Sequence, residues 1–184
     1  MQVTIFKSVF DKENPHVITL QTALSRIQDG KSSTTIDQVR KGDKDKKKRL
    51  PVVCFSGEFS SRADDALFEH SGFIVLDFDH VDVDKTKRSL ATDDFVHSCW
   101  TSPSGNGVKA LVNITNPERH RDHFRALVKY FEKQHGLEVD ESGVNESRAC
   151  YESYDPDIII KDECKKFGAF TSEHAEAQTP TNEA

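Results

Sequence analysis

The chain has 184 residues, of which 35% are hydrophobic and 30% charged, and a formal net charge of −6. This composition predicts one globular domain with its own core and a tail, and it argues against a protein that binds DNA by charge alone. No apolar run is long enough to cross a bilayer, the N-terminus lacks a signal-peptide pattern and the four cysteines form no CxxC pair, so we expect a cytoplasmic protein without a membrane partner or a zinc site.

The N-terminal part, residues 1–49, predicts a small strand–helix unit that ends in a basic loop. Residues 2–9 alternate loosely, as in a strand, and a helix follows that is capped by Thr19 and ends at Gly30. The lysine-rich run at 44–49 has two interpretations. It is either a solvated loop or a contact to a nucleic-acid backbone.

The segment 50–165 carries the apolar runs of a core. Residues 108–114 alternate, which predicts a strand with one buried face, whereas 73–76 show no polar alternation, as in a strand buried on both faces. Further strands are expected at 52–55, 148–153 and 158–160, and helices at 61–70, 84–91 and 116–136. Residues 166–184 have little to bury and predict a disordered tail.

The most informative motif is a pair of aspartates at the end of the apolar run at 73–76. Side chains two apart on a strand share a face, so Asp77 and Asp79 project together and repel each other unless a cation compensates them. Hard carboxylate oxygens favour Mg²⁺ or Mn²⁺, which position phosphates in nucleotidyl transfer. The alternative is that both aspartates only end the strand. Asp82 and Asp84 fit a helix cap better than a metal site.

A turn of small residues precedes the alternating strand. Its members are Ser102, Ser104, Gly105 and Gly107, and Lys109 follows just inside the strand. Small residues let backbone N–H groups approach an anion closely, and a lysine adds positive charge near a phosphate. A plain hairpin turn is equally compatible with this stretch.

Two later residues extend the candidate site. Asp140 follows the main helix and is in position to return to the aspartate pair as a third carboxylate. Arg148 opens a predicted strand, and its guanidinium suits bidentate binding of a phosphate. Asp155 and Asp157 flank a proline and are interpreted as turn residues.

Together these stretches resemble the VirE N-terminal domain family, a branch of the archaeo-eukaryotic primase (primase-polymerase) superfamily. The matching segments lie between residues 50 and 160 and read LPVVCFSGEFSSR, SGFIVLDFDHVD, TSPSGNGVKALV and VDESGVNESRACYESYDPDI. The resemblance implies the α+β primase-polymerase fold. In that fold an RRM-like antiparallel sheet with flanking helices lies beside a small N-terminal α/β unit.

The resemblance also implies roles for individual residues. The paired acids and the later acid of that superfamily bind the catalytic metals, which makes Asp77, Asp79 and Asp140 the expected metal ligands and catalytic residues. In that superfamily a turn and a histidine hold the phosphates of the nucleotide, and the turn that contains Ser102, Ser104, Gly105 and Gly107 matches it here. Arg148 matches a basic residue that follows the later acid in related primases. Lys109 occupies the histidine position here; it can bind a phosphate but cannot shuttle a proton near neutral pH.

The expected function is that of a DNA-replication domain of phage or mobile-element type. The resemblance implies nucleotidyl transfer on a single-stranded DNA template, with nucleoside triphosphates as substrates, Mg²⁺ or Mn²⁺ as cofactor and a replicative helicase as partner. Lys109 leaves open a non-catalytic module of the same fold that binds template or helicase. A third alternative is a phosphotransferase of the haloacid-dehalogenase type, because IVLDFD also resembles its first motif, with Asp77 as nucleophile and Asp79 as general acid.

Overall fold

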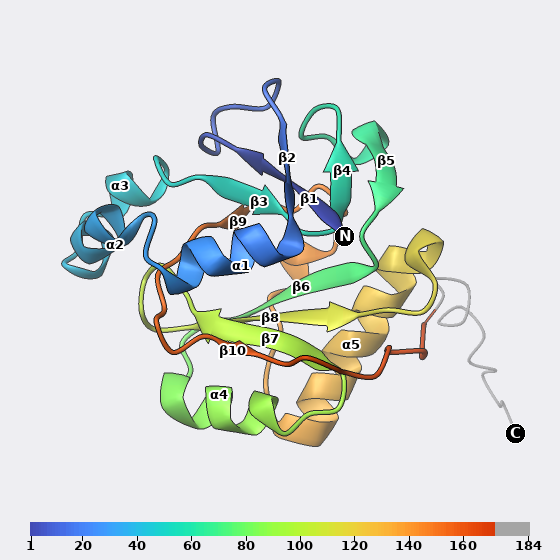
Figure 1. Cartoon of the computed structure of the whole chain (residues 1–184). Helices are drawn as coiled ribbons and strands as arrows, with labels where there is room; N and C mark the ends of the chain where they lie inside the picture. The colour runs from blue at the N-terminus through green and yellow to red at the C-terminus, as the bar shows by residue number, and fades with distance from the viewer. Residues whose placement is uncertain (172–184) are drawn as a thin grey trace, which may run out of the picture.

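The computed structural model describes residues 1–171 and shows two four-stranded antiparallel sheets and a two-stranded hairpin, with helices around them (Figure 1). The first sheet, of order β2–β1–β3–β9, is built from β1 (Gln2–Phe6), β2 (His16–Thr19), β3 (Val52–Cys54) and β9 (Cys150–Tyr151). The second, of order β10–β7–β8–β6, is built from β6 (Phe73–Phe78), β7 (Val96–Thr101), β8 (Val108–Asn113) and β10 (Ile159–Ile160). The hairpin joins β4 (Gly57–Phe59) and β5 (Leu67–His70). The predicted α+β class is confirmed.

The helices α1 (Leu20–Gln28), α4 (Val83–Ala91) and α5 (His120–His135) lie close to where the local sequence signals predict. Two further helices, α2 (Ser33–Arg40) and α3 (Lys44–Lys47), form in the stretch that was predicted as a basic loop. Thr19 caps α1, because its hydroxyl accepts a hydrogen bond from the Thr22 amide at 3.0 Å. Gly136 ends α5 in the left-handed conformation, with φ of 63°, which glycine adopts without strain.

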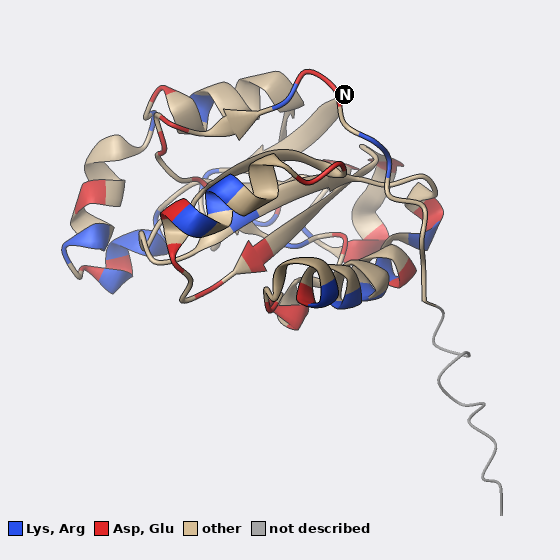
Figure 2. Cartoon of the chain, turned by 90° about the horizontal axis from the view of Figure 1, so that it is seen from below, with Lys and Arg blue, Asp and Glu red and all other residues tan. Residues whose placement is uncertain are grey.

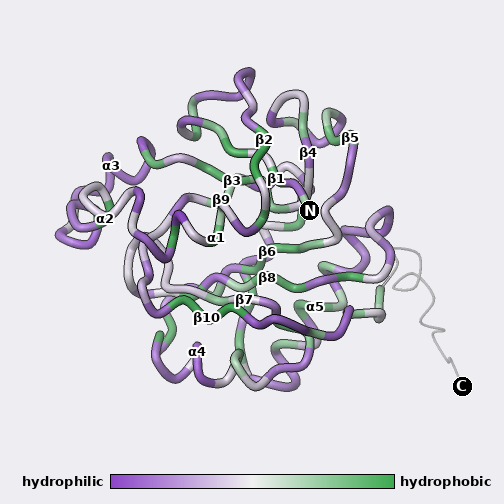
Figure 3. The backbone as a smooth tube through the Cα atoms, viewed as in Figure 1, coloured by the Kyte–Doolittle hydropathy of each residue, from purple (hydrophilic) through white to green (hydrophobic). Residues whose placement is uncertain are grey.

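The second sheet lies at the centre of the molecule and is covered on both faces (Figure 1). The helices α4 and α5 cover one face, and α1 with the first sheet covers the other. The hydropathy of the residues follows this arrangement, since the apolar stretches run along the inner strands and α3 is hydrophilic (Figure 3). The central sheet thus separates two large apolar layers, and two smaller buried clusters lie around Phe6 and around Ile36.

Strand β6 contributes to both layers, as the unbroken apolar run predicted. Ile74, Leu76 and Phe78 pack toward α4 and α5. Phe73 and Val75 pack toward α1 and the first sheet. By the same alternation Asp77 belongs to the face that looks toward the first sheet, and this places its carboxylate between the two sheets.

The order of elements in the second half is β6–α4–β7–β8–α5, with β6 and β7 on either side of β8. After α5 the chain returns along the free edge of β6, where the Asp140 amide donates a hydrogen bond to the Asp77 carbonyl at 2.9 Å. The fourth strand of the sheet, β10, pairs instead at the outer edge of β7. The expected N-terminal unit shares a sheet with later residues, because β1 pairs with β3 and β3 with β9.

Two expectations about local structure differ from the fold. The helix predicted at 61–70 is wrong: the segment forms a 3₁₀ turn at Asp64–Ala66 and then β5, because backbone pairing with β4 outweighs the local pattern. Phe167, which lies in the predicted tail, is 3% exposed, and its amide donates to the Asn113 carbonyl at 2.7 Å. Residues 172–184 of that tail lie outside the described residues.

No helix within residues 1–171 is both long and apolar enough to cross a membrane. Over the same residues all four cysteines are free thiols, and Cys54, Cys99 and Cys150 are buried. Burial raises the pKa of the Cys54 thiol to about 12, so this cysteine stays protonated at neutral pH.

Candidate phosphate-binding site

A pocket of about 460 Å³ opens between the two sheets, at the end of β6. Its walls come from distant parts of the chain: the loop after β1, α3, the loop after β4, the ends of β6 and β8, and the segment 140–151. The lining residues are Val9, Lys47, Arg62, Asp77, Asp79, Lys109, Asp140, Ser142, Asn145, Ser147, Arg148, Ala149 and Tyr151. Seven of these carry charge, four positive and three negative, so more than half of the lining residues are charged.

Asp77 and Lys109 face each other across neighbouring strands. They are register partners in the antiparallel pair of β6 and β8, and the Lys109 ammonium donates a hydrogen bond to Asp77 Oδ1. Both side chains are only 11% exposed. Burial alone raises the pKa of Asp77, but the nearby Lys109 and Arg148 outweigh burial and hold it below its ordinary value.

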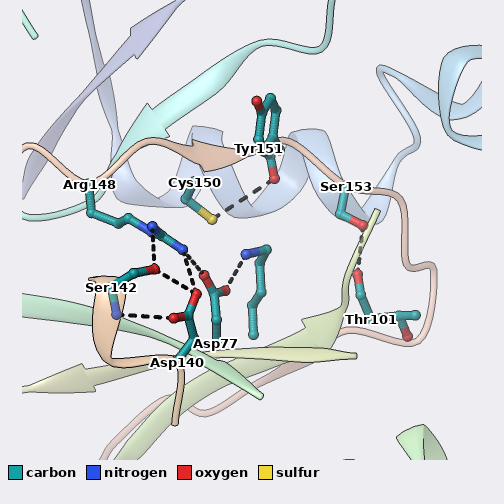
Figure 4. Close-up of polar contacts among 9 residues, drawn as sticks. Asp77, Thr101, Asp140, Ser142, Arg148, Cys150, Tyr151 and Ser153 are labelled. Carbon is teal, nitrogen blue, oxygen red and sulfur yellow. Dashed lines mark hydrogen bonds and ion pairs between the residues drawn. The ribbon is translucent and has the colours of Figure 1, made fainter. Parts of the chain in front are cut away.

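Arg148 connects the first and third predicted carboxylates. Its Nη2 lies 2.9 Å from Asp77 Oδ2 and 3.2 Å from Asp140 Oδ2, and Figure 4 shows the three side chains converging. Asp140 also caps the 3₁₀ turn Glu141–Gly143, accepting a hydrogen bond from the Ser142 amide at 3.0 Å. The Nε of Arg148 is buried without a hydrogen-bond partner. Asp140 therefore lies in the same pocket as Asp77, as the sequence predicted.

Asp79 lies in the pocket beside Asp77 but is differently placed. It is exposed and, within residues 1–171, forms no salt bridge. Gly107 packs directly against it: a Cβ added there would lie 3.3 Å from Asp79 Oδ1 and 2.8 Å from the Phe78 carbonyl oxygen. Only glycine permits this close approach between the turn and the end of β6.

The small-residue turn itself does not line the pocket. The Ser102 amide donates to the Gly107 carbonyl at 2.8 Å, and the Gly105 amide donates to the Ser102 carbonyl at 3.0 Å. These amides are thus used within the turn and do not point at an anion. Ser102, Ser104, Gly105 and Gly107 are therefore not among the residues that line the pocket. Arg40 lies beside the turn and donates from Nη2 to the Ser102 carbonyl at 3.3 Å. Lys109 and Arg148 are the two predicted phosphate-binding residues that it brings to the site.

The pocket also holds residues that the sequence reasoning did not assign. Arg62 follows β4 and donates from Nη2 to the Val9 carbonyl at 2.6 Å. Lys47 lies over the ring of Tyr151, with its Nζ 5.4 Å from the ring centroid. The basic run at 44–49 contains Lys47 and had indicated a possible contact to a nucleic-acid backbone. Figure 2 shows basic residues where α2 and α3 lie. Arg62 ends the segment LPVVCFSGEFSSR, but no role at the site was assigned to it from the sequence.

The arrangement sets a limit on metal binding. Among the described residues, no three histidine, cysteine, aspartate or glutamate side chains are grouped so that they could hold a metal ion. Arg148 lies between Asp77 and Asp140 and takes the place that a shared cation would have. A cage of three protein carboxylates is thus not formed, although two carboxylates suffice for an ion that is also bound by substrate phosphates.

Comparison with known proteins identifies a family. The sequence model described as BT4734-like, N-terminal domain matches residues 45–159, more than half of the chain. This is a different family from the VirE N-terminal domain family, so the resemblance stated from the motifs is wrong as an assignment. No curated protein and no solved structure matches the chain at a significant level. All seven charged residues of the pocket lie within the matched range.

Proposed function

The chain belongs to the BT4734-like, N-terminal domain family, and we propose that its pocket binds the triphosphate of a nucleotide with a divalent ion and transfers the nucleotide to a strand paired with a single-stranded DNA template. One observation supports this proposal most strongly. Three carboxylates and two cations, the buried Lys109 and the partly buried Arg148, meet in one pocket although they come from separate segments. Nucleotidyl transfer needs both kinds of group, one for cations and one for phosphates.

The divalent ion in this proposal enters with the nucleotide. Mg²⁺ is commonly held by one or two carboxylates together with substrate phosphates, and Asp77 and Asp79 supply two on the same strand end. When bound, such an ion neutralises phosphate charge and lowers the pKa of the attacking hydroxyl. Asp79, which forms no salt bridge within residues 1–171, is the carboxylate most ready to accept it.

Lys109 and Arg148 have a second role in this proposal. Both now neutralise Asp77, and the Nε of Arg148 still lacks an acceptor. With a divalent ion held at Asp77, Lys109 and Arg148 would be free to donate to phosphate oxygens in place of the carboxylate. Arginine offers a fork of donors that matches a phosphate, and lysine offers a point charge.

A non-catalytic module that binds template is the second candidate, and the ion pairs favour it. Asp77 is already compensated by two cations, and the described residues contain no ready three-ligand metal site. The phosphotransferase alternative loses support. It needs a later pair of acids near Asp77, but Asp155 forms an ion pair with Lys87 at 2.6 Å and does not line the pocket. For both remaining candidates we propose a replicative helicase as the source of single-stranded template.

Primer extension on a single-stranded DNA template separates these candidates. With Mg²⁺ or Mn²⁺ and nucleoside triphosphates, the proposal expects extension that is lost in Asp77→Asn and Asp79→Asn. Asp84→Asn is a matched control, because Asp84 is an exposed carboxylate in the first turn of α4, outside the pocket. Extension that persists in both pocket variants contradicts the proposal. Template binding without any extension selects the non-catalytic module.

A further inference from the structure

We infer that Arg62 and Lys47 form a second phosphate-binding position in the pocket, so that its ligand is a polyphosphate chain and not a single phosphate group. This inference deepens the proposed function and rests on it for the nucleotide part of the ligand. Lys47 lies in the basic run at 44–49 and Arg62 ends the segment LPVVCFSGEFSSR, but the sequence assigned neither of them to this site. Their placement in the pocket comes entirely from the fold.

Arg62 is held in the pocket wall with donor capacity left over. Its amide donates to the Lys12 carbonyl at 2.8 Å, and its Nη2 donates to the Val9 carbonyl at 2.6 Å, so both backbone and side chain are fixed. Its Nε is buried and has no hydrogen-bond partner. Within residues 1–171 Arg62 forms no salt bridge. A guanidinium without an anionic partner at the wall of a pocket is a favourable position for an anionic ligand, which would compensate its charge.

Lys47 adds a second positive charge that no carboxylate compensates in the described part of the chain. It is the last residue of α3 and lies over the Tyr151 ring, which also lines the pocket. The ring orients the ammonium by a cation–π contact but does not neutralise its charge.

The four cations of the pocket therefore fall into two pairs. Lys109 and Arg148 are already bound to Asp77 and Asp140, whereas Arg62 and Lys47 have no anionic partner in residues 1–171. A single phosphate group bound by the first pair leaves the second pair unsatisfied. The pocket volume of about 460 Å³ is many times the roughly 30 Å³ that one water occupies in the liquid, so it has room for several linked phosphates.

Calorimetric titration of the full chain with inorganic tripolyphosphate and with inorganic phosphate tests the inference. We expect tripolyphosphate to bind more tightly, and Arg62→Gln to weaken its binding about tenfold or more, as for the loss of one charge-assisted hydrogen bond. Lys47→Gln acts in the same direction, and Arg62→Lys restores part of the loss because charge returns without the fork. Arg88→Gln, an exposed arginine of α4, is the matched control and leaves affinity unchanged.

The outcomes distinguish this inference from the proposed function. Arg62-dependent tripolyphosphate binding without nucleotide incorporation keeps the second phosphate position and removes the nucleotidyl-transfer proposal. Equal affinity of wild type and Arg62→Gln for tripolyphosphate overturns the inference, provided circular dichroism shows both are folded. If Arg62→Gln loses single-stranded DNA binding but keeps its affinity for tripolyphosphate, the inference is overturned as well, because Arg62 then contacts the template backbone.

Discussion

Lys109 donates a hydrogen bond to Asp77 from directly across the antiparallel pair of β6 and β8, and Arg148 binds the other oxygen of the same carboxylate. One buried carboxylate thus joins the central sheet to the segment that carries Arg148. The charges proposed to bind phosphate are therefore also charges that hold the pocket walls together. Substitutions in this pocket are expected to change stability as well as ligand binding.

Replacing Lys109 by methionine should destabilise the protein by about 1–3 kcal/mol. Removing one partner of a buried ion pair usually has a larger effect, but Arg148 still compensates Asp77 in this variant. Denaturant unfolding at pH 7 measures the change. Lys85→Met, at an exposed position of α4, serves as control and should leave the midpoint unchanged. An equal midpoint for Lys109→Met and wild type would mean that the pair contributes nothing.

Replacing Arg148 by glutamine should strengthen binding of divalent ions. The substitution removes the positive charge between Asp77 and Asp140, so the two carboxylates repel each other and favour a cation. Thermal denaturation should therefore show a larger stabilisation by Mn²⁺ in the variant than in wild type. Arg119→Gln, whose partner Asp122 lies on α5, is the control. A smaller Mn²⁺ effect in Arg148→Gln than in wild type would contradict this account of the site.

Alanine at position 107 should destabilise the protein by about 1–3 kcal/mol and displace Asp79. Its Cβ would come within 2.8 Å of the Phe78 carbonyl oxygen, so the turn must move away from the end of β6. Gly168→Ala is a suitable comparison, because its Cβ meets Thr115 at an ordinary 3.6 Å. Unfolding midpoints of the two variants check the prediction. Similar midpoints would show that the turn can move at little cost in stability.

The histidine pair away from the pocket should make stability depend on pH. His70 Nε2 and His120 Nδ1 are 2.9 Å apart, and the Gly72 amide donates to His70 Nδ1 at 2.9 Å, so the contacts fit two neutral rings. Burial lowers the pKa of His70 to about 4 and that of His120 to about 3. Since the unfolded rings take up protons near pH 6.5, stability is complete above that pH and falls as the pH drops toward 4.

The measurement is the free energy of unfolding between pH 7 and pH 5. Each histidine should contribute a loss of up to about 2 kcal/mol by pH 5. The double variant His70→Gln with His120→Gln should show a flatter dependence, whatever its absolute stability. His16→Gln, on the exposed part of β2, should keep the wild-type slope. Identical slopes in the double variant and wild type would rule out the pair as the cause.

Local rules in the sequence accounted for much of the fold and part of the site. The unbroken apolar run before Asp77 predicted a strand buried on both faces, and the two-residue period placed Asp77 and Asp79 in one pocket. The caps at Thr19 and Gly136 likewise depend on neighbouring residues alone. Motif order also suggested that Asp140 and Arg148 would reach Asp77, and the contacts agree, although the family named from those motifs was wrong.

Only the tertiary structure decided which other side chains reach the pocket. Residues 67–70 joined a hairpin because their backbone paired with β4, and hydrogen bonds to the carbonyls of Lys12 and Val9 hold Arg62 at the site. In the turn before β8 the amides of Ser102 and Gly105 bond within the turn itself, whereas Lys109 and Arg148 reach the pocket. Such outcomes depend on hydrogen bonds and packing between residues far apart in the chain. A local pattern predicts the period of a strand or the cap of a helix, because both depend on neighbouring residues. It does not predict which distant segment a strand pairs with, because that depends on the free energy of contacts between the two segments.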